Sequence, residues 1–232
     1  MRPGEYTVID IETYPDIDMI GKLPEIPFEE AKTGNLKDPD KIAAKEAEAL
    51  SKHEEKKMAQ VAEMALNPLY GKIACVGYQM GTGDSTINNK GCAIDQDEEK
   101  VIRTFFDKII PFGQTGSPKI VTWNGMGFDI PFIYKRAMIL GVKPTVSMGY
   151  FMKRYQTDTH CDLMQVWCNW YGREKLDNVA KALLGEGKQD FDFRTIKDLI
   201  KVSEGREKIA EYCSKDVEIT SKLFYKMANI LF

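Results

Sequence analysis

Cysteine is scarce in this sequence, and its spacing excludes two classes of protein. The chain has five cysteines, at positions 75, 92, 161, 168 and 213, and no Cys-x-x-Cys pair. An odd count without paired spacing argues against a disulfide framework and a zinc ribbon, and it fits a reducing compartment. The first residues, MRPGEYTVIDIET, lack the apolar stretch of a signal peptide, and no window approaches the roughly 20 apolar residues of a membrane span. We therefore expect a cytoplasmic protein with no membrane partner.

A surplus of positive charge is also missing. The formal net charge is −3, so no overall basic field attracts a polyanion. Nucleic acid would be held by local basic patches and metal ions, and its binding would be weak and would decrease as the salt concentration rises. The Gly-Thr-Gly segment at 81–83 is not followed by the residues of a phosphate-binding loop. The length of 232 residues suffices for one large domain with a full core, or for two small ones.

Apolar residues are arranged in segments typical of alternating strands and helices. The predicted strands are 6–11, 72–79, 85–94 and 119–123, the third with a turn at Asn88–Gly91. The predicted helices are 98–110, 129–140 (closed by Gly141), 161–171, 177–184, 193–200 and 206–231. This order predicts an α/β fold in which a mixed sheet is covered by helices on both faces.

A stretch between the first two predicted strands departs from this pattern. Residues 23–35 are rich in proline and predicted to be loop, whereas residues 38–66 are rich in Lys, Glu and Ala and predicted to form one long helix. Its apolar stripe is thin and its charges are of both signs, which favours a solvated surface helix. The alternative is a lid over a substrate cleft, with lysines that touch phosphates. We expect one domain, 1–232, with 23–66 as an insertion within it.

Acidic residues stand beside apolar segments in three separate parts of the chain. Asp10 and Glu12, in VIDIET, are two apart at the predicted end of a strand, so their side chains share a face. Asp129, in WNGMGFDIPF, lies near the start of a helix, where an aspartate often serves only as a cap. Tyr212 and Asp216, in EYCSKDV, lie on one face of a helix and could simply hydrogen-bond each other. Each pattern alone has an ordinary structural explanation.

The four carboxylates acquire a common explanation when they are taken together. Carboxylates held near a core repel one another unless a cation neutralises them. Hard oxygen ligands favour Mg²⁺ or Mn²⁺, and a pair of such ions stabilises the attacking and leaving oxygens of a phosphodiester. The pattern therefore predicts a two-metal nuclease. This hypothesis fails if the carboxylates are scattered in the fold, or are pinned instead by arginine or lysine.

In this order, VIDIET, NGMGFDIPF and YCSKDV resemble the three exonuclease motifs of the DEDD superfamily of 3′→5′ exonucleases, which have a DnaQ-like, ribonuclease H-like fold. The spacing Tyr-x-x-x-Asp marks the tyrosine subclass, because the histidine subclass would have histidine at Glu211. The chain is most similar to the proofreading domain of family-B DNA polymerases and to stand-alone, phage-like relatives. HCDLMQVW, whose Asp162 is expected near the cleft, and KLDNVAKALLG share this similarity. The resemblance spans Tyr6 to Leu223 without the insertion.

The resemblance implies roles for eight residues. The ligands of two divalent cations, Mg²⁺ or Mn²⁺, would be Asp10, Glu12, Asp129 and Asp216. Asp10 would bridge the two ions. Tyr212 would orient the attacking water, since its reference pKa of ~10 makes it a poor base at neutral pH. Thr13, Asn124 and Phe128 would contact the terminal nucleotide, with core packing as an equal alternative for Phe128.

The function implied is a proofreading-type 3′→5′ exonuclease that releases nucleotides from single-stranded or frayed DNA. RNA is an alternative substrate, because the sequence identifies no residue that would recognise a 2′-hydroxyl. A DNA polymerase or another replication protein is the expected partner in trans, in the cytoplasm or, for a phage protein, the host cytoplasm. Two alternatives remain: a non-catalytic module on the same fold that binds nucleic acid or protein, and a structure-selective endonuclease.

Overall fold

The computed structural model describes residues 6–34, 36–81, 89–110 and 119–231. The chain forms two compact units, one of Met1–Tyr14 with Lys72–Phe232 and one of Pro15–Gly71, which are described separately here. None of the helices in the described part of the chain combines the length and the apolarity that a membrane crossing requires.

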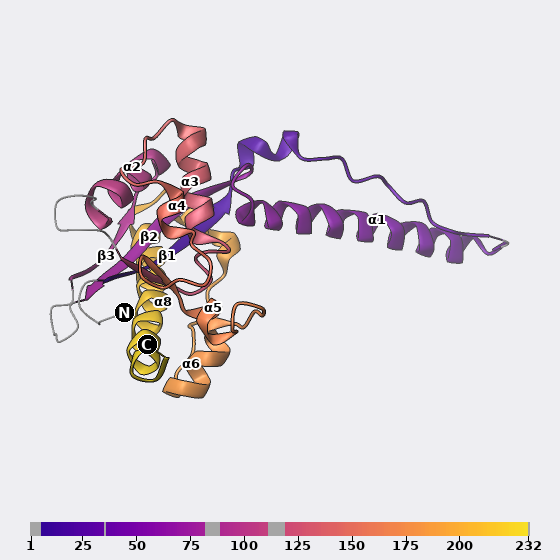
Figure 1. Ribbon diagram of the computed structural model, residues 1–232. Coiled ribbons are helices and arrows are strands. Elements are labelled where there is room, and N and C mark those ends of the chain that lie inside the picture. Colours follow the sequence, from indigo (N-terminus) through magenta and orange to yellow (C-terminus); the bar gives the residue numbers. More distant parts are fainter. Residues whose placement is uncertain (1–5, 35, 82–88, 111–118, 232) are drawn as a thin grey trace. The chain divides into compact units, whose positions relative to one another are not determined.

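The larger unit is built on a five-stranded sheet with the strand order β3-β2-β1-β4-β5 (Figure 1). The strands are β1 (Tyr6–Pro15), β2 (Gly71–Gly81), β3 (Asn89–Ile94), β4 (Ile120–Thr122) and β5 (His160–Asp162). β1 pairs with β4, and β4 with β5, in parallel, whereas β2 and β3 are antiparallel. The sheet is therefore mixed, as the sequence predicts.

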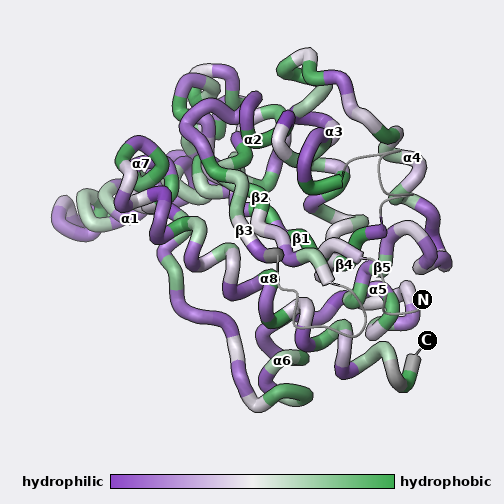
Figure 2. Tube along the Cα trace, turned by 90° about the vertical axis from the view of Figure 1, so that its left-hand side faces the viewer, coloured by the Kyte–Doolittle hydropathy of each residue, from purple (hydrophilic) through white to green (hydrophobic). Residues whose placement is uncertain are grey.

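Helices cover both faces of this sheet. On one face lie α2 (Glu98–Thr104), the π-helix η3 (Phe105–Ile109), α3 (Asp129–Leu140) and α4 (Met148–Phe151). On the other lie α5 (Leu163–Trp167), α6 (Leu176–Leu184), η4 (Phe193–Thr195), α7 (Ile196–Leu199) and α8 (Ser203–Leu231). Along β1, Ile9 and Ile11 join the first core, whereas Tyr6 and Val8 join the core with α8. Figure 2 shows hydrophobic residues along β1 and β2 and on the helices beside them. This arrangement confirms the predicted fold class.

Three sequence predictions about single elements are wrong. β1 continues through Pro15, because Thr13 and Tyr14 also favour extended backbone, so Asp10 and Glu12 lie inside the strand and not at its end. The predicted turn at Asn88–Gly91 lies partly outside the described residues, and its last three residues pair with β2 as strand. The predicted helix 161–171 begins instead with β5, because pairing with β4 holds His160–Asp162 extended.

A buried ion pair links α2 to α3. The guanidinium of Arg136 donates to both carboxylate oxygens of Glu98, at 2.8 and 2.6 Å, and both side chains are 6% exposed. Glu98 Oε1 also accepts from the backbone N–H of Ile73 in β2, at 2.8 Å. One carboxylate thereby joins two helices and a strand.

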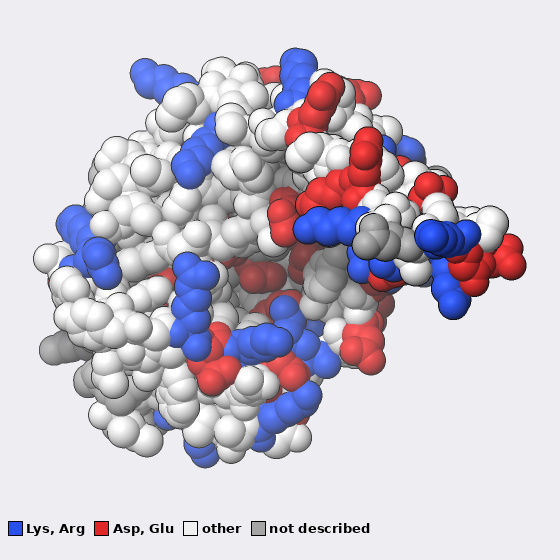
Figure 3. Space-filling model, turned by 90° about the vertical axis from the view of Figure 1, so that its right-hand side faces the viewer, with Lys and Arg blue, Asp and Glu red and all other residues white. Residues whose placement is uncertain are grey.

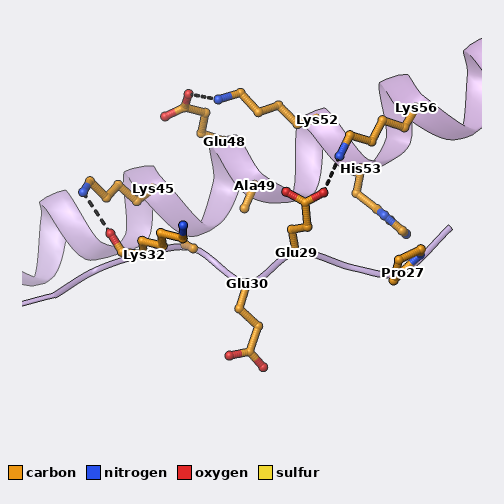
Figure 4. A pocket seen from close by; sticks show the side chains of 11 residues that line it. Pro27, Glu29, Glu30, Lys32, Lys45, Glu48, Ala49, Lys52, His53 and Lys56 are labelled. Atoms are coloured by element: carbon orange, nitrogen blue, oxygen red, sulfur yellow. Dashed lines mark hydrogen bonds and ion pairs between the residues drawn. The ribbon is translucent and has the colours of Figure 1, made fainter.

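The smaller unit contains η1 (Ile17–Lys22), α1 (Pro39–Glu63) and η2 (Met64–Leu66). Asp38 caps α1, no α1 residue is buried, and the loop before it is fastened along the helix, for example by Lys56 to Glu29 at 2.7 Å (Figure 4). α1 is thus a solvated helix, and its use as a lid stays a hypothesis. The chain enters and leaves this unit side by side, since the N–H of Asp16 donates to the carbonyl of Tyr70 at 2.8 Å.

Candidate active site

Two carboxylates project from the middle of β1 toward α8. Side chains alternate along a strand, and Asp10 and Glu12 follow Tyr6 and Val8, which pack on the α8 side of the sheet. Glu12 is 6% exposed, and Asp10 is partly exposed. The apolar residues of β1 are buried in the cores on both faces of the sheet, and this packing holds the two carboxylates in a fixed position.

Asp129 joins the same place from the first turn of α3. Its Oδ1 accepts from the backbone N–H of Ile11, which lies between the two β1 carboxylates, at 3.2 Å. Phe128 occupies the N-cap position of α3, so the interpretation of Asp129 as a simple cap is wrong. The reason is geometric, because Oδ1 of its side chain reaches the backbone of β1. Asp129 is 3% exposed.

α8 supplies Tyr212 and Asp216. The Tyr212 ring is stacked on Phe191, with centroids 4.6 Å apart, and its edge contacts Phe193. Asp216 is 1% exposed, and neither of its carboxylate oxygens has a hydrogen bond of normal geometry. A carboxylate buried this deeply is costly unless a cation neutralises its charge.

Burial raises the pKa of all four carboxyls, and repulsion within the group raises the pKa of Asp10 and Glu12 further. Burial is the main cause for each. Asp129, Glu12 and Asp216 further raise the pKa of Asp10, and Asp216 further raises the pKa of Glu12, to about 8. The pKa of Asp129 rises to about 7, although two backbone N–H donors oppose the rise. The four groups therefore form one electrostatic cluster that favours protons or other cations.

Lys188 enters this cluster, and the sequence analysis missed it. Its Nζ lies 2.5 Å from Oδ2 of Asp216 and 5.7 Å from the centre of the Tyr212 ring. Burial lowers the pKa of Lys188, but the carboxylates of Asp216 and Asp10 outweigh burial and raise it. Among the described residues, Asp10, Glu12 and Asp129 make no ion pair. One carboxylate of four is thus pinned by a lysine, and one ammonium cannot neutralise the whole cluster.

Asp162 holds the turn that precedes Asp129. Its carboxylate accepts from four backbone N–H groups, those of Asn124, Met126, Met164 and Gln165, at 2.9–3.3 Å. It caps α5 and at the same time fixes Asn124 in the left-handed conformation, with φ of 66°. The sequence indicates only that Asp162 lies near the cleft. Its role as an organiser depends on β5, which the sequence analysis did not predict.

The three predicted nucleotide contacts occupy different settings. Thr13 is buried in β1, and Phe128 packs against Phe132, with ring centroids 5.4 Å apart, at the edge of the core. Asn124 lines a groove of about 630 Å³ that also includes Lys188. The other residues that line this groove are Trp123, Met164, Arg173, Glu174, Lys175, Leu176, Asp177 and Asn178. Figure 3 shows acidic side chains in a hollow, with lysine and arginine side chains beside it.

The raised pKa values predict how metal-free stability changes with pH. Unfolded carboxyls titrate near 4, whereas Glu12 titrates at about 8 and Asp129 at about 7 in the fold. Between these values the folded chain binds more protons, so its free energy of unfolding falls as pH rises. In chelator, we expect the melting temperature to drop on the order of 5 °C from about pH 5 to about pH 8.5. Glu12→Gln should flatten this drop, and a melting temperature that rises with pH would contradict the cluster.

Comparison with known proteins places the chain in a family. A family model described as "predicted 3'-5' exonuclease related to the exonuclease domain of PolB" matches residues 66–231. The chain is 35% identical over 139 residues to DNA polymerase 1 of Sulfurisphaera ohwakuensis, which covers 54% of this chain and 15% of that protein. It is 34% identical over 140 residues to DNA polymerase 1 of Saccharolobus solfataricus, with the same coverage. The chain thus spans only about 15% of the length of these curated relatives.

A solved structure has the same fold. The family B DNA polymerase of the hyperthermophilic archaeon Pyrobaculum calidifontis matches 97% of this chain and 25% of its own chain, with a TM-score of 0.59 and 18% sequence identity. The family model covers most of the chain and includes Asp129, Tyr212 and Asp216. The chain therefore belongs to the family of predicted 3′-5′ exonucleases that are related to the exonuclease domain of PolB.

Proposed function

We propose that this chain is a metal-dependent 3′→5′ exonuclease that hydrolyses the terminal phosphodiester of single-stranded or frayed DNA. The observation that carries the proposal is the cluster of Asp10, Glu12, Asp129 and Asp216, in which every carboxyl has a raised pKa. Such a cluster is costly in a folded protein unless it binds cations. Perturbed carboxyls beside a groove are also typical of catalytic sites.

The donor set fits two divalent ions of the Mg²⁺ or Mn²⁺ class. Its donors are carboxylate oxygens, which hard cations prefer, and the described residues place only one cation, the ammonium of Lys188 at Asp216, among the four carboxylates. Asp10, Glu12, Asp129 and Asp216 would hold the ions. When bound, such ions acidify a water and stabilise the oxygen that leaves the phosphorus.

The side chains around the carboxylates would position substrate and water. Burial raises the pKa of Tyr212, and Asp216 raises it further, so its hydroxyl stays protonated and can donate a hydrogen bond but cannot act as a base. Phe191 and Phe193 hold its ring in place. The groove lined by Asn124 and Lys175 offers polar and cationic contacts for a terminal nucleotide.

Tyr212→Phe tests the orienting role of the hydroxyl. The ring contacts with Phe191 and Phe193 remain in this variant, so fold and metal binding should be unchanged. We expect the single-turnover rate to fall roughly 10–100-fold, because water is no longer held by a donor. Metal titration followed by melting temperature provides the control. An unchanged rate would show that the hydroxyl does not handle water.

Lys188→Met tests whether the lysine competes with metal. Removing a positive charge 2.5 Å from Asp216 should lower the Mg²⁺ concentration for half-maximal activity roughly tenfold, about 1.4 kcal/mol. The maximal rate should fall, because a cation beside the groove is lost. Lys201→Met is the matched control, since Lys201 forms an exposed ion pair with Asp198 and neither residue lines the groove. An identical Mg²⁺ dependence in Lys188→Met would refute the competition.

The reaction is tested with 5′-labelled single strands of DNA and RNA in Mg²⁺, Mn²⁺ or chelator. A ladder that shortens from the 3′ end supports the proposal and identifies the polymer. Cutting of strands with blocked 3′ ends would favour a structure-selective endonuclease. Binding without cleavage would favour a non-catalytic module. Because the matched relatives are DNA polymerases, DNA is the first substrate to test and a polymerase the first protein partner.

A further inference from the structure

Three cysteine sulfurs, each from a different element, lie close together beside the carboxylate cluster. Cys75 lies on β2, Cys92 on β3 and Cys213 on α8, and their Sγ atoms all lie within 4.8 Å of one another. Cys75 and Cys213 are fully buried, whereas Cys92 is partly exposed. The exonuclease proposal assigns no task to these thiols.

The register between β2 and β3 brings the sulfurs of Cys75 and Cys92 together, and α8 adds the sulfur of Cys213. Gly77 pairs with Cys92, and Cys75 pairs with Ile94, so Cys75 and Cys92 are diagonal neighbours on the face toward α8. Gly77 lies between them without a side chain, and a Cβ at this position would lie 2.6 Å from Sγ of Cys213. Glycine therefore leaves the space in which the third sulfur reaches the sheet.

The separation of the sulfurs suits one thiophilic metal ion. Zinc–sulfur bonds of about 2.3 Å place three ligand sulfurs about 4 Å apart, so a small inward shift would complete a three-thiolate site. Cys92 is partly exposed, whereas Cys75 and Cys213 are buried, so the trio has one sulfur on the solvent side. A disulfide would use only two of the three sulfurs and would need them at bonding distance, about 2 Å.

We infer that Cys75, Cys92 and Cys213 bind a soft divalent ion of the Zn²⁺ class, at a three-sulfur site that adjoins the oxygen-ligand cluster. Thiolates favour such ions and carboxylates favour Mg²⁺. The sulfur site and the carboxylate site would therefore bind different metals. Each thiol that binds loses its proton to solvent. The inference stands independently of the proposed exonuclease activity. Cys213 touches both regions, since its thiol donates to the backbone carbonyl of Asp10 at 3.6 Å.

The test is a titration of the full chain with Cd²⁺ in a phosphine reductant, followed by sulfur-to-metal charge-transfer absorption. We expect saturation at one ion per chain with the intensity of three thiolates, and a higher melting temperature. Cys92→Ser should lose the three-thiolate band and the thermal shift. Cys168→Ser is the matched control, because it removes a thiol outside the trio and should keep both signals. Zn²⁺ should displace Cd²⁺ from wild-type protein.

Three results would overturn the inference. Absence of a charge-transfer band in wild-type protein means that the thiols only pack. A one-thiolate band that persists in Cys92→Ser and Cys75→Ser places the ion with Asp10, Glu12 and Cys213, whose ligand atoms also lie within 4.8 Å of one another. A mass loss of two hydrogens without reductant, combined with no metal binding in reductant, assigns a disulfide instead. Metal-free melting curves of the serine variants confirm that each one folds.

Discussion

Asp10→Asn is expected to lower nucleotide release at least roughly 1000-fold, about 4 kcal/mol of transition-state stabilisation, while it raises the melting temperature of the metal-free protein. The loss follows because one of the four carboxylates that would hold the ions becomes a neutral amide, which binds divalent ions poorly. The gain follows because Asp10 lies among three other acidic groups, each of which raises its pKa. Asparagine removes this repulsion without changing the side-chain size.

The opposite signs of these two effects distinguish a metal site from an ordinary structural carboxylate. A structural aspartate would lose stability when changed, and activity would fall only as far as folding does. Glu207→Gln, an exposed change on α8, should leave both quantities unaffected. Single-turnover release from 5′-labelled DNA and thermal melting in chelator provide the measurements. Near-wild-type release by Asp10→Asn would remove Asp10 from the site.

Arg136→Met is expected to cost about 3–5 kcal/mol of unfolding free energy, the usual penalty for leaving one member of a buried ion pair alone. Methionine fills a similar volume, but Glu98 keeps its buried carboxylate and loses both donors from the guanidinium. Urea unfolding of the metal-free protein measures the change. Activity per folded molecule should be unchanged, since neither residue lines the groove or belongs to the carboxylate cluster.

The double variant Glu98→Gln/Arg136→Met provides the sharper comparison. A glutamine oxygen can still accept from the backbone N–H of Ile73, as Glu98 does at 2.8 Å, and no buried charge remains. The double variant should therefore be more stable than Arg136→Met alone. If the two unfold at the same urea concentration, the isolated charge is not the source of the loss.

The sequence predicts much of this architecture because its signals are local. Apolar alternation locates β1, the spacing of Asp129 and Gly141 bounds α3, and Asp38-Pro39 starts α1. The family resemblance is confirmed, and it names the same carboxylates that the fold gathers.

The residues that escaped prediction act over long sequence distances. Lys188 meets Asp216 across 28 positions and follows no helical or strand period, so its spacing carries no signal. The sequence places Asp162 only near the cleft, and it is the β4–β5 pairing that brings the Asn124 turn to it. The three sulfurs depend on the β2–β3 register and on Gly77, which cysteine spacing alone does not reveal.

The hydrogen bond between Asp16 and Tyr70 has a consequence for the ancestry of the chain. It joins the two ends of the 15–71 segment. The residues between these ends can therefore become more or fewer with little effect on β1 and β2, which flank the segment. A segment whose ends are joined in this way tolerates inserted residues, because the entropic cost of closing a longer loop grows only slowly with loop length. Helix α1, with no buried residue, would then be the part of this chain most free to diverge between species.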